Sequence, residues 1–378
     1  MKTLEFFQKQ NIHNLIKKIQ KEIQKRRKYF IMEFCGGHTH SLLKYGIVDL
    51  LPEEIEMIHG PGCPVCVMPI ERIDLAIELA KQSQCILCTY GDLLRVPGSN
   101  RKSLLHLRSE GYDIRMVYSC LETIEIAKKN PNKEIIFFSI GFETTTPPTA
   151  ILIKTIEKEN IKNLSVVSNH VLTPSAIQHI LNSPELREMH SVPIDAFIGP
   201  GHVSTIIGYE PYEYFVEEFQ KPVAISGFEP EDLLLSILFL IRSINNKNPI
   251  LINELSRFVT REGNLKAKTL VSDVFELRKE FKWRGLGLIP YSALQIQKKY
   301  SKVDAEKKFQ VLLPKPKENK ACICGFVLRG LKKPTECPIF GKICTPENPM
   351  GSCMVSSEGA CAAYYLYKNF NQNYEKNL

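Results

Sequence analysis

The chain has 378 residues and a formal net charge of +8, with 44% apolar and 24% charged residues. This length exceeds the roughly 250 residues at which single cores stop growing, so we expect two or three domains. No apolar run reaches the ~20 residues that span a bilayer, and the N-terminus lacks the apolar stretch of a signal peptide. We therefore expect a cytoplasmic protein without a membrane span.

A basic run, KKIQKEIQKRRK at residues 17–28, carries much of the positive charge. It is typical of a solvated helix face, and the alternative is a docking surface for an acidic partner or for nucleic acid. The chain shows no helix-turn-helix motif and no RNA-binding motif of the RNP type. We therefore expect no nucleic-acid partner.

Eight short apolar runs predict buried strands that alternate with helical stretches. The runs are residues 29–35, 54–60, 84–91, 113–120, 134–143, 164–170, 195–201 and 222–227. Between them, segments such as MPIERIDLAIELAKQ show the 3.6-residue apolar period of helices. This alternation predicts an α/β fold of two doubly wound parallel sheets.

Seven of these strands lead directly into loops with unusual residues. The loops are CGGHTH, HGPGCPVC, TYGD, GFETT, SNH, GPGHVS and SGFEP. Parallel sheets bind ligands at the carboxyl ends of their strands, so these loops predict a cleft between the two sheets. The polar groups of GFETT (Glu143, Thr144 and Thr145) and of GPGHVS (His202 and Ser204) either shape this cleft or cap helices.

We place the first α/β domain at residues 1–130 and the second at residues 131–310, with a helical extension from residue 229. A linker, LLPKPKENK at residues 312–320, precedes a cysteine-rich tail, and we assign residues 311–378 to a third, small domain.

Twelve cysteines in a reducing compartment indicate metal binding or thiol chemistry rather than structural disulfides. Six lie in the tail, which contains no histidine and no CxxC pair, so a zinc site there would need four widely spaced thiolates. Proline-rich turns beside cysteines are typical of iron–sulfur sites. We therefore favour a [4Fe-4S] cluster over zinc or over buried inert thiols.

Spacing alone does not decide which four tail cysteines bind a cluster. Side chains two apart on an extended segment point to opposite faces, so Cys322 and Cys324 are not expected to share one cluster. One set leaves Cys322 and Cys353 as a possible dithiol beside the cluster. It consists of Cys324, Cys337, Cys344 and Cys361.

The two front loops carry the remaining candidate site residues. Cys35 ends a predicted strand, and the amides of the following turn are expected to lower its pKa toward the metal-binding thiolate. His38 either positions ligands or a proton, or bonds to backbone in the turn. Cys63 and Cys66 have the spacing of a redox-active dithiol, with a half zinc site or simple packing as alternatives. We expect Cys85, Cys88 and Cys120 to be core residues.

In order along the chain, several motifs together resemble the HypD family of [NiFe]-hydrogenase maturation factors. They are FCGGHTH, GPGCPVC, GFETTTP, GPGHVSTIIG, SGFEP and CPIFGKICTPENPMGSCMVSSEGACAAYY. The resemblance covers residues 30–365. It implies two α/β domains and a third that carries a [4Fe-4S] cluster in surroundings similar to those of ferredoxin:thioredoxin reductase. It also implies a stable complex with HypC, on which Fe(CN)2CO is assembled from cyanide that passes from HypF to HypE.

The resemblance also implies site roles. Cluster ligation falls to the set of four tail cysteines already given, and Cys35 would hold the iron with a cysteine of HypC. By analogy, Cys322 and Cys353 would relay electrons to Cys63 and Cys66. We interpret the chain as a redox-active assembly scaffold rather than a conventional turnover enzyme. The alternatives are an iron–sulfur-driven thiol-disulfide oxidoreductase and a zinc-stabilised binding protein.

Overall fold

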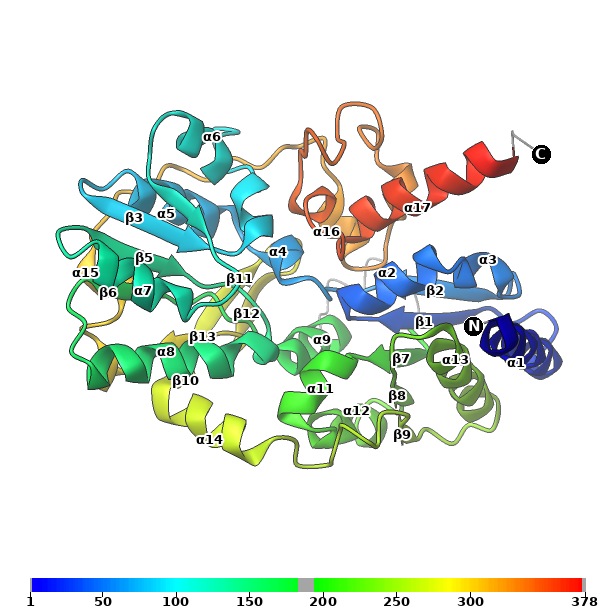
Figure 1. Cartoon of the computed structure of the whole chain (residues 1–378). Coiled ribbons are helices and arrows are strands. Elements are labelled where there is room, and N and C mark those ends of the chain that lie inside the picture. Colours follow the sequence, from blue (N-terminus) through cyan, green and yellow to red (C-terminus); the bar gives the residue numbers. More distant parts are fainter. Residues whose placement is uncertain (1, 183–193, 376–378) are drawn as a thin grey trace.

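The structure is a computed structural model of the chain and describes residues 2–182 and 194–375. It contains two parallel β-sheets, one of five strands and one of four, with helices packed against them (Figure 1). The C-terminal part, which holds six of the cysteines, packs beside both sheets. The predicted α/β class with a cysteine-rich C-terminal part is confirmed.

The five-stranded sheet has the strand order β2-β1-β7-β8-β9, and all of its pairings are parallel. Its strands are β1 (Tyr29–Glu33), β2 (Ile55–His59), β7 (Ala196–Gly199), β8 (Val223–Ile225) and β9 (Leu251–Asn253). Helices α1 (Lys2–Glu22) and α13 (Pro230–Asn245) contact each other and share one core with this sheet. The inner strands are buried at every residue except the partly buried Phe30, as expected of parallel strands covered on both faces.

The four-stranded sheet has the order β4-β3-β5-β6 and is also parallel. Its strands are β3 (Cys85–Thr89), β4 (Ile114–Met116), β5 (Glu134–Phe138) and β6 (Leu164–Val167). The helices that pack around it are α5 (Ile70–Ala80), α7 (Glu122–Lys129) and α8 (Thr146–Lys158). All eight predicted strands are therefore present, each inside its expected range.

The sheets divide the chain differently from the boundary predicted near residue 130. That boundary falls inside the four-stranded sheet, where β3 pairs with β5 from Cys85↔Glu134 to Cys88↔Phe137. The chain builds β1 and β2, crosses to the other sheet for β3 to β6, and returns with β7 between β1 and β8. Pairing between strands distant in sequence decides this division, and the strand pattern alone does not encode it.

Residues 229–310 are less helical than expected. Beside α13 and α14 (Leu265–Val274), this segment contains β9 and the strands β10 (Phe275–Leu277), β11 (Glu280–Trp283), β12 (Gly287–Pro290) and β13 (Leu294–Ile296). In β11 the buried Phe281 and Trp283 alternate with the exposed Glu280 and Lys282. This period of two is the strand signal that the prediction of a helical extension overlooked.

Short elements fill the loops that follow the strands. They are α2 (Gly36–Lys44), α3 (Ile47–Leu50), α4 (Pro64–Val67), η1 (Gly91–Arg95), α6 (Leu104–Ser109), η2 (Glu143–Thr145), α9 (Thr173–Asn182), α11 (Gly201–Ile207), η3 (Glu210–Tyr212), α12 (Glu213–Glu217), η4 (Lys298–Tyr300) and α15 (Ala305–Lys308). The carboxyl ends of the two sheets face each other, and α11 contacts η2 across this junction (Figure 1).

The C-terminal part consists of α16 (Cys324–Val327), η5 (Pro334–Glu336), η6 (Ser352–Met354) and α17 (Ala360–Glu375), joined by turns. Helix α17 lies along α2, and η6 contacts α4 (Figure 1, orange to red). This part therefore covers the two loops that carry Cys35 and the CPVC motif. Within the described residues, no helix combines the length and apolar character needed to cross a membrane.

Candidate functional site

The CGGHTH and GPGCPVC loops lie against each other because their strands are neighbours. Glu33 at the end of β1 is paired with His59 at the end of β2. Beyond the strands, the amide of Gly36 donates to the carbonyl of Gly62 at 2.9 Å. A Cβ atom at Gly62 would lie 2.5 Å from the backbone nitrogen of Cys35, so only glycine permits this approach. Cys35 and Cys63 are thus held in touching loops.

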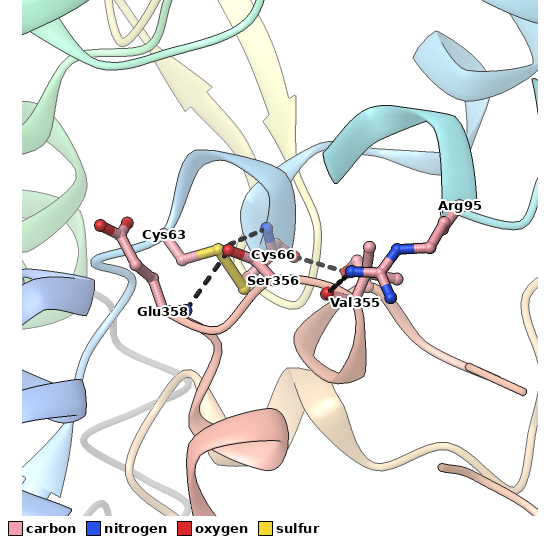
Figure 2. The surroundings of a disulfide bond; sticks show 7 residues. Cys63, Cys66, Arg95, Val355, Ser356 and Glu358 are labelled. Carbon is pink, nitrogen blue, oxygen red and sulfur yellow. Dashed lines mark hydrogen bonds between the residues drawn. A yellow bond between two sulfur atoms is a disulfide. The ribbon is translucent and has the colours of Figure 1, made fainter. Parts of the chain in front are cut away.

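Cys63 and Cys66 form a disulfide, with their Cα atoms 5.2 Å apart (Figure 2). Cys63 caps the N-terminus of α4, and the amide of Cys66 donates to the Cys63 sulfur at 3.2 Å. Both residues are buried. The pair is therefore within bonding geometry for reversible oxidation, the chemistry expected of a redox-active CxxC motif.

The C-terminal part closes over this disulfide. The hydroxyl of Ser352 donates to the carbonyl of Cys66 at 2.9 Å. Figure 2 shows the segment that continues through Val355, Ser356 and Glu358 beside the disulfide, with Arg95 donating to the carbonyl of Val355 at 2.6 Å. The residue next to Ser352 is Cys353, so the C-terminal cysteines and the CPVC loop are joined through one hydrogen bond and one peptide.

Cys35 is buried, in the N-cap position of α2. Burial, followed by the charge of Glu358, raises the pKa of the Cys35 thiol to about 12, although the amides of Gly37 and His38 act in the opposite direction. The prediction that the turn lowers the pKa of Cys35 is therefore wrong for the protein without a bound metal. Because a coordinated cation deprotonates a thiol outright, the thiolate would form with a metal at the sulfur.

The two glycines after Cys35 have a packing reason. A Cβ atom at Gly36 would lie 2.4 Å from Cβ of Glu358, and one at Gly37 would lie 2.7 Å from Cε1 of Phe228. Glu358 comes from the C-terminal part, and Phe228 follows β8. Two separate segments therefore converge on the backbone of this loop.

His38 is fully buried, and its Nε2 lies 3.2 Å from the carbonyl oxygen of Ser226. Since a carbonyl only accepts, Nε2 carries the proton, which leaves Nδ1 as an acceptor. Nδ1 has no partner within the described residues. Burial lowers the pKa of His38 to about 4, so the ring is neutral near pH 7. His38 thus forms a hydrogen bond with the backbone, which is one of the two alternatives predicted for it. Its Nδ1 atom also remains available as an acceptor.

Phe228 organises two histidines from different loops. Its ring stacks on His38 with centroids 4.7 Å apart and on His202 with centroids 4.1 Å apart. Burial lowers the pKa of His202. The loops that follow β1, β7 and β8 are therefore joined by one aromatic stack.

A buried polar network that the sequence analysis did not identify lies beneath Cys35. The carboxylate of Glu33, which is fully buried, accepts from the Thr39 hydroxyl, from the Cys35 amide at 3.2 Å and from Nδ1 of His59 at 2.7 Å. Nε2 of His59 lies 3.2 Å from the Tyr364 hydroxyl of α17. The sequence did contain a signal for this network, namely the charged Glu33 inside the apolar run YFIMEFC. Glutamate is rarely buried without partners, so its position indicated a buried polar network.

All six C-terminal cysteines line one small cavity. They are Cys322, Cys324, Cys337, Cys344, Cys353 and Cys361. The amide of Met350 also donates to the Cys344 sulfur at 3.3 Å, a type of hydrogen bond that tunes iron–sulfur clusters. The convergence of six thiols fits a donor set for a cluster.

Cys322 and Cys324 do not point to opposite faces, which corrects the prediction. A Cβ atom at Gly351 would lie 2.5 Å from the Cys322 sulfur and 3.6 Å from the Cys324 sulfur. Cys324 begins α16, so the segment is not extended and the alternation of a strand does not apply. A hydrogen bond with Cys324, followed by burial, raises the pKa of Cys322. In the structure, Cys322 of the predicted dithiol therefore lies next to Cys324 of the predicted ligand set.

Within the described residues, no three His, Cys, Asp or Glu side chains converge closely enough to hold a single metal ion. A four-iron cluster has a different requirement, because each of its four thiolates binds a separate iron. The six cysteines that line one cavity are enough to supply the four thiolates of such a cluster.

The remaining polar candidates, in the loops after β7 and β5, form hydrogen bonds within the protein. Ser204 donates to the carbonyl of Pro200 within α11 at 2.8 Å. The carboxylate of Glu143 accepts from the amide and hydroxyl of Thr173 at 2.8 and 2.9 Å, and so joins the loops after β5 and β6. Burial raises the pKa of Glu143 to about 7. Cys85, Cys88 and Cys120 are buried, as predicted.

Comparison with known proteins identifies the family of this chain. The family model described as "HypD: Hydrogenase formation hypA family" matches residues 10–368. The chain is 55% identical to hydrogenase maturation factor HypD2 of Bradyrhizobium diazoefficiens over 372 residues, which are 98% of each chain. It is 55% identical to HypD of Cupriavidus necator, over 93% of each chain, and 41% identical to HypD of Escherichia coli, over 89% of each chain. The chain therefore belongs to the HypD family of hydrogenase maturation factors.

Proposed function

We propose that this protein is the scaffold on which, in a complex with HypC, the Fe(CN)2CO unit of a [NiFe]-hydrogenase is assembled, with cyanide delivered by HypE. Membership of a family of hydrogenase maturation factors supports a role in the maturation of a hydrogenase. The observation that carries the scaffold role is the contact between the Cys35 loop and the Cys63–Cys66 disulfide. In this proposal, the contact would set an iron-binding thiol beside a dithiol that carries two electrons.

Cys35 is the proposed ligand of the iron cargo, completed by a cysteine of HypC. Two buried polar atoms beside this loop lack hydrogen-bond partners within the described residues, namely Nδ1 of His38 and Oγ of Ser226. Buried polar groups without partners are rare in native proteins, and a bound group commonly explains them. These two atoms are suited to position ligands of the cargo.

The proposed cluster ligands are Cys324, Cys337, Cys344 and Cys361, which leave Cys322 and Cys353 as thiols within the same cavity. A [4Fe-4S] cluster bound there would supply single electrons. The protein itself would carry out thiol chemistry: reduction of the Cys63–Cys66 disulfide consumes two electrons and two protons and yields two thiols. Reoxidation of this dithiol to the disulfide returns two electrons and two protons, which would cleave the sulfur–carbon bond of a thiol-bound cyanide group and yield a thiol and hydrogen cyanide.

The burial of the disulfide disfavours a free-standing thiol-disulfide oxidoreductase. Cys63 is 3% exposed and Cys66 is 0% exposed, so the thiol of a protein substrate would have no direct access to either sulfur. Exchange with an external disulfide requires attack in line with the sulfur–sulfur bond. An enclosed cargo beside Cys35 fits this geometry better.

Infrared spectroscopy of the protein copurified anaerobically with HypC tests the proposal. We expect bands from metal-bound CN and CO in the unaltered protein and in Cys120→Ala, a buried cysteine away from the site. We expect no such bands in Cys35→Ala, and none in Cys63→Ala or Cys66→Ala. Full-strength bands in the Cys63→Ala and Cys66→Ala proteins would show that the dithiol has no part in assembly.

A further inference from the structure

A second cavity, of about 780 Å³, lies between the four-stranded sheet's loops and the C-terminal part. It is lined by four parts of the chain: residues 95–106, the turn at residues 284–285, the end of the linker at residues 317–319, and the C-terminal turns. Its volume falls in the range typical of small-molecule sites. Neither the family resemblance nor the proposed function assigns it a role.

The lining of this cavity is strongly cationic. Five side chains carry positive charge, namely Arg95, Arg101, Arg284, Lys317 and Arg329, against the two carboxylates of Glu318 and Glu347. Arg95 donates to the carbonyl of Val355, and Arg101 donates to the Met350 sulfur at 3.1 Å. These neutral partners orient two guanidinium groups without cancelling their charge.

Arg284 provides an independent indication of a ligand. It is 6% exposed, and its Nε is buried without a hydrogen-bond partner in the described part of the chain. Its backbone is fixed, because its amide donates to the carbonyl of Val67 in α4 at 2.8 Å. An unpaired donor of a buried guanidinium is costly, and an anionic acceptor in the cavity would satisfy it.

The cavity also reaches the cysteine cluster. Cys322 and Cys324 line both this cavity and the six-cysteine cavity. Gly285 and Gly325 permit the close packing here, since a Cβ atom at Gly285 would lie 2.5 Å from Cα of Gly325. A molecule bound beside Arg284 would therefore lie against Cys322 and Cys324, at the edge of the six-cysteine cavity.

We propose that this cavity binds a small polyanionic molecule that carries phosphate or carboxylate groups, held by Arg284, Arg101 and Lys317 next to Cys322 and Cys324. Guanidinium groups bind both kinds of oxyanion through paired hydrogen bonds. The site is independent of the proposed function, because binding can be measured on the protein without hydrogenase maturation.

Isothermal titration calorimetry of the full-length, anaerobically purified protein tests this site, with inorganic pyrophosphate and citrate as separate probes at constant ionic strength. We expect saturable binding of one molecule of at least one probe. We expect Arg284→Met and Arg101→Ala each to weaken it at least about tenfold, the loss of one charge-assisted contact. Arg108→Ala is the matched control, an exposed arginine of α6 that does not line the cavity.

The outcomes separate the two chemistries. Binding of pyrophosphate alone identifies a phosphate site, and binding of citrate alone identifies a carboxylate site. The proposal is overturned if neither probe saturates, or if Arg108→Ala weakens binding as much as Arg101→Ala does. Because Arg101 is exposed, its variant is expected to fold even if Arg284→Met does not, and unchanged binding in Arg101→Ala would also overturn the proposal.

Discussion

Ser352 donates its hydroxyl to the backbone carbonyl of Cys66 at 2.9 Å, and this bond joins residues 286 positions apart in the sequence. Both residues are fully buried. The bond fixes the turn before Cys353 to the helical turn that contains the disulfide. It thereby sets the spacing between the two groups of cysteines on which the proposed redox role depends.

Ser352→Ala is expected to destabilise the protein by about 1–3 kcal/mol, because the buried carbonyl of Cys66 loses its partner. Urea denaturation measures this loss. Ser109→Ala is the matched control, since its exposed hydroxyl also donates to a backbone carbonyl, that of His106 at 2.7 Å. Equal stabilities of the two variants would mean that the Ser352 bond contributes no more than a surface contact.

Serine variants of the C-terminal cysteines test the predicted ligand set. We expect Cys324→Ser, Cys337→Ser, Cys344→Ser and Cys361→Ser to lose most of their iron and acid-labile sulfide, because a [4Fe-4S] cluster needs four thiolates. Cys322→Ser and Cys353→Ser should retain both. Chemical analysis of iron and sulfide measures the result. Loss of iron in Cys322→Ser with retention in Cys324→Ser would show that Cys322 is a ligand instead.

Glu33→Ala should cost about 3 kcal/mol or more of unfolding free energy, because three donors lose their acceptor in a buried site. Tyr364→Phe removes a single hydrogen bond at the far end of the same network and should cost about 1 kcal/mol. Urea denaturation compares them. If both variants lose the same stability, the carboxylate of Glu33 is not the centre of the network.

Glu143 should make stability depend on pH. Its folded-state pKa of about 7 exceeds the ordinary glutamate value of 4.5, because burial disfavours the charged form, so the folded protein holds this proton more tightly than the unfolded chain does. The resulting stabilisation is present below about pH 4.5 and is lost as the pH rises toward 7, with a total of roughly 3 kcal/mol at most.

Glu143→Gln removes this titration. Relative to the unaltered protein, the variant should gain unfolding free energy between pH 5 and pH 8, as measured by urea denaturation at both values. Glu125→Gln, at an exposed position of α7, serves as the control and should show no such gain. A constant difference between Glu143→Gln and the unaltered protein at the two pH values would contradict the raised pKa.

Local patterns were sufficient for most of the strands and for the loops that follow them. Apolar runs bounded by glycine and proline identified eight of the nine strands of the two main sheets in their correct ranges, because a parallel strand buried on both faces is apolar along its length. They missed β9, which lies in the segment that was expected to be helical. The same patterns failed at Phe281 and Trp283, where a short period-two segment was taken as helix. The basic run at residues 17–28 is largely exposed, apart from buried Ile19, but only residues 17–22 belong to helix α1, so the expectation of one solvated helix face holds for the first half of the run alone.

The sequence by itself determined the α/β class, the positions of Cys35 and the CPVC pair at strand ends, and the gathering of six cysteines near the C-terminus. Only the tertiary structure decided that β7 lies beside β1, that Ser352 meets Cys66, and that Glu33, His59 and Tyr364 share one network. The physical reason is that strand identity depends on side chains a few residues apart, whereas these contacts join segments far apart in the chain. They form only when the strands pair and the C-terminal part packs over the loops.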